Sequence, residues 1–201
     1  MSLRPVLAPV VLVAAAASLG GCGINAIPAA DENVKARWAD VQADYQRRAD
    51  LIPTLVATVK GSVQGEDKVL TDVINARAKA TSVQVNASDL TDPAKVAQFA
   101  NAQSQLNGSL GRLLATVESY PQVQSQGNFK TLMSQLEGTE NRINIAIRDY
   151  NTAVQSYNTQ IRTFPDAIGA RVFYGAKPVT PYQATSPGAE NAPAVSFGNM
   201  S

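Results

Sequence analysis

The stretch DENVKARWADVQADYQRRADLIPTLVATVK, residues 31–60, decides the fold of this 201-residue chain. Its apolar residues return at alternating steps of three and four, which is the spacing of one face of an α-helix. The stripe consists of Val34, Trp38, Val41, Tyr45, Ile52, Leu55 and Val59, with Arg48 as a polar member. The stretch therefore predicts a long amphipathic helix over residues 31–64, about 50 Å in length, which Pro53 should kink.

Three later stretches repeat this spacing and predict helices over residues 66–85, 92–120 and 128–164. The second of these begins at Asp92-Pro93, where Asp is a good N-cap and proline suits the first helical position. The three stripes are Val69, Val73, Ala76, Ala80 and Val83; Val96, Phe99, Gln103, Leu106, Leu110, Leu113, Val117 and Tyr120; and Phe129, Leu132, Leu136, Thr139, Ile143, Ala146, Tyr150, Ala153, Tyr157, Gln160 and Phe164.

The four predicted helices define the expected fold class. No stretch shows the period-two alternation of a half-buried strand, so we expect an all-α protein. Helices joined by short loops pack as antiparallel neighbours. The fold predicted for residues 31–174 is therefore an antiparallel up-and-down four-helix bundle with long first and last helices. Residues 175–201 are rich in Pro, Ala, Ser, Gly and Thr, and we expect this tail to be disordered.

The chain contains a single cysteine, Cys22, and no histidine. One thiol cannot form an internal disulfide, and a catalytic cysteine normally needs a histidine to accept its proton. Cys22 follows a positive charge at Arg4, an apolar run over residues 6–17 and a set of small residues. This is the layout of a secretory signal, and the run is shorter than the ~20 residues that cross a bilayer. Cys22 is therefore predicted to be an attachment point.

The motif LGGC at 19–22 resembles the bacterial lipobox, in which the cysteine receives a diacylglycerol and signal peptidase II cuts before it. The resemblance implies a lipoprotein signal peptide over residues 1–21, lipidation of Cys22 and a linker over residues 22–30. Several acyl chains on one residue hold a protein stably at a membrane. By resemblance to the sorting rule of two-membrane bacteria, Gly23 in place of Asp favours the outer membrane. An ordinary signal peptide or an uncleaved anchor is the alternative.

Charge argues against nucleic acid as the main partner. The chain has 17 Lys and Arg against 16 Asp and Glu. Arg4 is the one charged residue before Cys22, so the remainder carries 16 residues of each sign. Phosphate binding depends on clustered Lys and Arg, and the sequence contains no basic block.

Three stretches together resemble the LemA family of bacterial envelope proteins. They are YQRRADLIPTLVATVKG at 45–61, NGSLGRLLATVESYP at 107–121, and GTENRINIAIRDYNTAVQSYNTQIRTFP at 138–165. The last is the most specific, because it contains Glu-Asn-Arg at 140–142 and Tyr-Asn pairs at 150 and 157. The resemblance covers residues 31–182 and implies a four-helix domain that faces away from the cytoplasm. Many members look membrane-spanning at the N-terminus, whereas this chain carries a lipobox, and some relatives are linked to shaping of internal membranes.

Two charged groups on the predicted helices invite a functional interpretation. Glu137 and Glu140 are three residues apart, near Arg142, and could bind a metal or act as acid and base. Helical di-iron sites require Glu-x-x-His motifs, so a salt-bridged helix face or a partly buried polar layer that fixes helix register is favoured. Arg47-Arg48, next to Asp50, could bind an anionic partner, but two adjacent arginines are expected on a solvated face, with the stem of Arg48 along the edge of the core.

Gly108-Ser109-Leu110-Gly111 matches the GxxG loop of RNA-binding KH domains only on paper. The motif lies inside a continuous helical stripe without flanking strands, which is the wrong context for that loop. Two glycines on a helix instead predict close packing of two backbones, at a cost of ~1 kcal/mol in helix propensity for each glycine.

These observations favour a lipid-anchored helical adaptor of the bacterial envelope that is not an enzyme. We predict no catalytic, cofactor-binding or metal-ligating residue, and we expect the partners to be the membrane, through acyl chains on Cys22, and other envelope proteins. Self-association is compatible with this prediction. The rival functions are a membrane-shaping oligomer and a hydrolase that uses Glu137, Glu140 or an Asp.

In an up-and-down bundle the last helix ends at the level where the first begins. We therefore expect the stretch TFPDAIGARVFYGAKP at 163–178 to return towards the anchored end. It would either close the base of the bundle or rest on lipid headgroups, with Arg162, Arg171 and Lys177 adding weak attraction.

Overall fold

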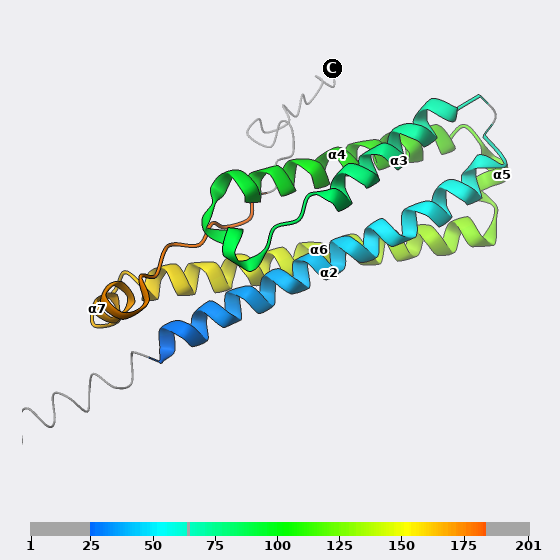
Figure 1. The fold of residues 1–201 in the computed structure, drawn as a ribbon. Helices are drawn as coiled ribbons and strands as arrows, with labels where there is room; N and C mark the ends of the chain where they lie inside the picture. Colours follow the sequence, from blue (N-terminus) through cyan, green and yellow to red (C-terminus); the bar gives the residue numbers. More distant parts are fainter. Residues whose placement is uncertain (1–24, 64, 184–201) are drawn as a thin grey trace, which may run out of the picture.

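The computed structural model describes residues 25–63 and 65–183, and it is helical apart from short connections and a final extended segment (Figure 1). The long helices are α2 (Ala26–Lys60), α3 (Asp67–Ser82), α4 (Pro93–Val117) and α6 (Gly127–Gln160). The shorter elements are the 3₁₀ helix η1 (Ala87–Thr91), the single turns α5 (Pro121–Gln124) and α7 (Asp166–Gly169), and the π-helical η2 (Ala170–Tyr174). The predicted all-α class is confirmed.

The long helices are arranged as two pairs (Figure 1). α2 and α6 lie side by side and run in opposite directions, and α3 and α4 form a second, shorter antiparallel pair. α2 has 35 residues and α6 has 34, so each is about 50 Å long. The predicted long first and last helices are thus present, with α5 at one end of the pair and α7 at the other, here named the α5 end and the α7 end.

The predicted stripes form the core. Every stripe residue of α2 is buried, Arg48 included, as are the α4 stripe from Val96 to Val117 and the α6 stripe from Phe129 to Tyr157. On α3 the buried residues are Leu70, Val73 and Ala80. The buried stripe therefore begins at Leu70, one residue after the predicted Val69. The 3.6-residue period therefore identified the buried faces correctly.

The apolar core is divided into two clusters along the molecule. The cluster near the α7 end includes α2 as far as Tyr45 and α6 from Ile143 onward. The cluster near the α5 end takes α2 from Ile52 onward and α6 as far as Leu136. Between the two clusters lie three buried polar residues from three of the long helices, Arg48 on α2, Gln103 on α4 and Thr139 on α6.

The first helix begins earlier than predicted. Residues 26–30 were expected to belong to a linker, but α2 starts at Ala26. Ile27 is buried in the cluster near the α7 end, and Ala30 packs against it. Pro28 is tolerated because an N–H in the first turn of a helix has no acceptor within the helix, so the N–H that proline lacks is not needed there. Burial of Ile27 therefore extends the helix past the point where the sequence periodicity becomes visible.

The prediction of a disordered tail from residue 175 is wrong for residues 176–183. This segment is extended and packs on the bundle, with Val179 and Tyr182 both buried. We name it the strap. Its Pro-rich composition lacks a helical period, but two side chains at a spacing of three residues bury enough apolar surface to hold it. Residues 184–201 lie outside the described part.

Other boundaries differ by a few residues. α4 ends at Val117 and α6 at Gln160, each before the predicted proline stop. The predicted start of α4 is confirmed, because Asp92 Oδ1 accepts from Ala94 N at 2.9 Å. α2 passes through Pro53 as one helix.

Among the described helices none combines the length and hydropathy needed to cross a bilayer. The predicted signal peptide and Cys22 lie outside the described residues.

Candidate functional site

The best-defined polar arrangement in the described part surrounds Arg48 at the middle of α2. The residue as a whole is 2 % exposed. Its Nη1 donates to Asn107 Oδ1 at 2.7 Å and to Glu140 Oε2 at 3.1 Å, and its Nη2 donates to Gln103 Oε1 at 2.9 Å. Gln103 Nε2 in turn donates to Ala80 O of α3 at 3.4 Å. The guanidinium therefore connects α2 to α4 and α6 directly, and to α3 through Gln103.

The position of Arg48 corrects the prediction of a solvated arginine at the core edge. A planar guanidinium presents five N–H groups in a fixed fork, so it can bind acceptors on two neighbouring helices at once. The acceptors on α4 and α6 compensate for much of the desolvation that burial imposes. The sequence signal was present, because Arg48 falls on the apolar stripe and so does Gln103. Arg47, which lies off the stripe, is exposed as predicted.

The two members of the Arg48–Glu140 ion pair differ in their exposure to solvent. The side chain of Glu140 is 43 % exposed, whereas that of Arg48 is 3 % exposed. The Arg48 Cζ lies 4.9 Å from the centroid of the Tyr45 ring, close enough for a cation–π contact. Within the described residues, Arg48 Nε is buried without a hydrogen-bond partner. A half-exposed carboxylate and an aromatic ring thus stabilise one buried positive charge.

The structure separates the two predicted carboxylates. Glu140 binds Arg48, while Glu137 is exposed and lies on the rim of a different hollow, together with Lys130 and Met133. The interpretation of Glu140 as part of a partly buried polar layer is confirmed. Within residues 25–63 and 65–183 no group of three or more Cys, Asp or Glu is arranged to hold a metal ion.

Two asparagines of α6 hold the strap by its backbone. Asn158 donates Nδ2 to Val179 O and accepts from Val179 N at Oδ1, both at 2.8 Å. Asn151 makes the same pair of bonds with Tyr182, at 3.0 and 2.8 Å. The two residues are seven apart on one helix, so they lie on the same face two turns apart. Each asparagine amide therefore binds both the N–H and the C=O of one strap residue, as a neighbouring strand would do in a sheet.

The Tyr-Asn repeats of the sequence have a structural explanation. In each pair the tyrosine, Tyr150 or Tyr157, is buried in the core, and the asparagine that follows binds the strap. Tyr150 Oη also donates to Thr180 O at 2.8 Å. Sequence reasoning did not assign the asparagines a role, although their equal spacing from two core tyrosines was a usable signal.

The strap completes an aromatic cluster around Trp38. The Trp38 ring lies 5.1 Å from Tyr150, 5.3 Å from Phe99 and 6.5 Å from Tyr182, measured between centroids. The hydroxyls of Tyr45 and Tyr182 share a hydrogen bond of 2.7 Å. Burial raises the pKa of Tyr45, Tyr150 and Tyr182, so these phenols are neutral at physiological pH.

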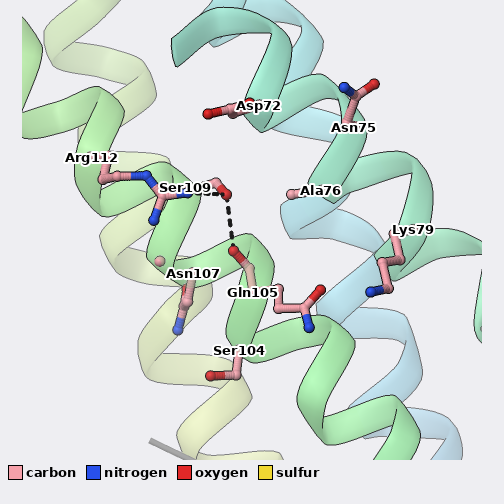
Figure 2. A pocket seen from close by; sticks show the side chains of 10 residues that line it. Asp72, Asn75, Ala76, Lys79, Ser104, Gln105, Asn107, Ser109 and Arg112 are labelled. Atoms are coloured by element: carbon pink, nitrogen blue, oxygen red, sulfur yellow. Dashed lines mark hydrogen bonds between the residues drawn. The ribbon is translucent and has the colours of Figure 1, made fainter. Parts of the chain in front are cut away.

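An open groove of about 720 Å³ runs between α3 and α4 (Figure 2). Figure 2 shows charged and amide side chains along both walls, with Asp72 and Lys79 on α3 and Arg112 on α4. Arg112 Nη2 donates to Ser109 Oγ at 3.0 Å, and Ser109 Oγ donates to Gln105 O at 3.0 Å. The groove is polar and mixed in charge, which suits a polar segment of a partner protein.

The prediction of close helix packing at the two glycines of α4 is wrong. A Cβ added to Gly108 would have Arg112 Nη1 as its nearest neighbour, at 3.9 Å, and one added to Gly111 would meet nothing within 4 Å. Gly108 lines the groove, where the missing side chain leaves space that a partner can enter. No second backbone approaches either glycine closely enough to need it.

Residues 163–178 lie at the α7 end, where they cover the core as one of the two predicted arrangements requires, and contact with lipid stays a prediction. Gly169 and Ala170 are buried, and Ala170 belongs to the same cluster as Ile27 of α2. The large apolar side chains of the stretch point outward, and Phe164 is the most exposed of them at 83 %.

Comparison with known proteins identifies one family. A sequence model of the LemA family matches residues 37–197, which is most of the chain. No curated protein matches the chain significantly. The match includes the Arg48 layer, the two strap-binding asparagines and the strap.

Proposed function

Because the chain belongs to the LemA family, we propose that it is a lipid-anchored, non-catalytic helical protein of the bacterial cell envelope. It acts as an interaction scaffold or adaptor at the membrane surface, on the periplasmic face of the outer membrane. The two helix pairs work as one up-and-down bundle, whose register the Arg48 layer fixes. The membrane partner is bound through acyl chains on Cys22.

The short distance between Cys22 and α2 carries this proposal. Ala26 is the first helical residue, four positions after the cysteine. Four residues of extended chain span at most about 14 Å, so a lipidated Cys22 keeps the start of α2 at the bilayer. A helix pair about 50 Å long then projects into the envelope. This geometry suits a platform that presents binding surfaces at a defined distance from the membrane.

The groove between α3 and α4 is the surface that we assign to the partner protein. It is lined by polar side chains of both signs and bordered by Gly108. Such a surface favours a hydrated, salt-sensitive contact over a permanent apolar one. A photocrosslinker at Gln105 in the groove should give a defined adduct in cells, and one at the exposed Thr131 on α6 should not. Equal adduct patterns at both positions would count against the groove.

The anchor is tested by Cys22→Ser in the full-length protein. We expect this variant to leave the membrane fraction, because the acylation site is lost. Ile24→Ser keeps the cysteine and serves as the matched control, which should stay membrane-bound. Tight membrane association of the Cys22→Ser variant would contradict the proposal. Deformation of liposomes that depends on the anchor would instead favour the membrane-shaping function.

A further inference from the structure

In the segment from Phe164 to Tyr174, which includes α7 and η2, the small residues are buried and the large apolar residues are exposed. Its small residues Gly169 and Ala170 face the core. Its large apolar residues face outward, with exposed fractions of 83 % for Phe164, 57 % for Ile168, 68 % for Val172, 68 % for Phe173 and 43 % for Tyr174. Packing alone would favour the opposite arrangement, because burial of a large apolar side chain stabilises by about 1.5–3 kcal/mol. Five such side chains within eleven residues make an exposed patch, which we name the basal patch.

The basal patch lies where α2 begins (Figure 1). Ile27 and Ala170 belong to one core cluster, against which Ala30 and Ala176 also pack; Ala170 lies within the patch segment and Ala176 just after it. α7 therefore sits beside the N-terminus of α2, at the α7 end of the molecule. The chain that precedes the described part, including Cys22, joins the molecule at this same end.

Cations surround the basal patch. Arg162, Arg171 and Lys177 are all exposed. The acidic residue within the segment is Asp166, whose Oδ2 accepts from Gln160 Nε2 at 2.9 Å. On the adjacent turn of α2 the acidic Asp31 and Glu32 are both bound by Lys35. With Lys35 counted, four cations face three carboxylates, so the rim is weakly positive and complements an anionic surface.

We propose that the basal patch rests on the bilayer, with its apolar side chains in the headgroup region and its cations on the lipid phosphates. The inference builds on the proposed anchoring at Cys22, because an acylated cysteine within about 14 Å of α2 brings this end of the molecule to lipid. An apolar face flanked by arginine and lysine is the composition of an interfacial helix. Tyr174 and the long cationic stems suit the boundary between lipid and water.

This contact makes the anchor a two-point attachment. A single flexible tether would let the helix pair tilt freely, whereas a tether plus a docked base orients α2 and α6 away from the membrane. The α5 end and the groove between α3 and α4 are then held clear of the bilayer. The lipid contact thereby sets the direction in which the scaffold presents its partner surface.

The test uses lipidated full-length protein in vesicles of phosphatidylethanolamine and phosphatidylglycerol. Acylation blocks the thiol of Cys22, so Phe173→Cys provides one reactive site for an environment-sensitive fluorophore. Ile74→Cys on α3 is the matched control, because Ile74 is also an exposed apolar residue, at 50 %. We expect lipid-borne quenchers at headgroup depth to quench the label at 173 about threefold more than the label at 74.

The outcomes separate the two proposals. Equal quenching at both positions, in protein that stays with the vesicles, would overturn the lipid contact and leave the anchor intact. A label at 173 that is already shielded without lipid would show that a second copy or the N-terminal segment covers the patch, which also overturns the contact. Labelling of the unsubstituted protein would reveal a free Cys22 and overturn both proposals.

Discussion

Arg48 of α2 is bonded directly to two other helices. Its guanidinium binds acceptors on α4 and α6, although the residue is only 2 % exposed. A buried ion pair adds little net stability compared with a well-packed apolar pair. Removal of Arg48 is costly, however, because the buried Gln103 loses its donor where little water can replace it. We therefore expect Arg48 to specify helix register more than it raises stability.

Substitution at Arg48 should cost more than substitution of its counter-ion. We expect Arg48→Ala to lower the free energy of unfolding by about 3 kcal/mol, since it leaves Gln103 and Asn107 without their donor and opens a cavity. Glu140→Gln should cost about 1 kcal/mol, because its side chain is already 43 % exposed and can hydrate. Urea unfolding followed by Trp38 fluorescence measures both values. A larger loss for Glu140→Gln would contradict this account of the layer.

The side chains of two asparagines of α6, Asn151 and Asn158, bind the backbone of the strap. Asn158→Ala should raise the hydrogen-exchange rate of the Val179 amide about tenfold, because that N–H loses its acceptor Oδ1 and the backbone loses a second bond. Asn141→Ala, at an exposed position of the same helix, is the control and should leave that rate unchanged. An unchanged rate in Asn158→Ala would mean that burial of Val179 alone holds the strap.

At the scale of the element, α2 tolerates a proline that does not contribute to its packing. Pro53 is exposed and lies in the last third of the helix. Proline inside a helix removes one hydrogen bond and costs about 3 kcal/mol. Its neighbours Ile52 and Leu55 are fully buried, and their packing compensates for that loss.

Pro53→Ala should therefore stabilise the protein by about 1–3 kcal/mol, with the gain reduced by the greater freedom of the unfolded chain. Pro93→Ala is the matched control, because Pro93 occupies the first position of α4, where no N–H is needed. We expect no gain from that variant. Thermal unfolding compares the two, and a loss of stability in Pro53→Ala would show that the proline has a packing role.

The sequence predicted the elements unevenly, for physical reasons. Long helices repeat their period several times, so the buried faces of α2, α4 and α6 could be identified from the stripes. The start of α2 and the strap could not, because they depend on contacts between residues far apart in the chain, such as Ile27 with Ala170. Arg48 was identified as a break in the stripe, but its acceptors became visible only when α4 and α6 were placed beside it.

At the scale of the whole molecule, the aromatic cluster predicts sensitivity to alkaline pH. Burial raises the pKa of Tyr45, Tyr150 and Tyr182 above the value of about 10 that tyrosine has in an unfolded chain. Above that pH the unfolded chain has released protons that the folded protein still holds. The stability present below pH ~10 is therefore lost as pH rises through the folded-state values, by up to about 1.4 kcal/mol per pH unit for each tyrosine.

Substitution of the bonded pair should weaken this dependence. We expect the double variant Tyr45→Phe/Tyr182→Phe to lose less stability than the original chain between about pH 9 and pH 11, although it starts lower because the hydrogen bond is absent. Tyr174→Phe, at a residue 43 % exposed outside the cluster, is the control. Urea titrations at several pH values give the slopes. An unchanged slope in the double variant would show that other groups cause the alkaline loss.

The molecule has two distinct ends and one polar flank. The α7 end holds the basal patch and the start of α2, the α5 end is remote from it, and the groove opens between α3 and α4. In the proposed function the α7 end faces lipid and the groove faces a partner. The orientation of the whole scaffold then follows from two contacts with lipid, the acyl chains on Cys22 and the basal patch.

Mass spectrometry of the N-terminal peptide from the membrane-extracted protein tests the acylation of Cys22 most directly. The account predicts a chain that begins at Cys22 and carries a thioether-linked diacylglycerol. A free thiol at Cys22, or a peptide that still contains residues 1–21, would contradict it.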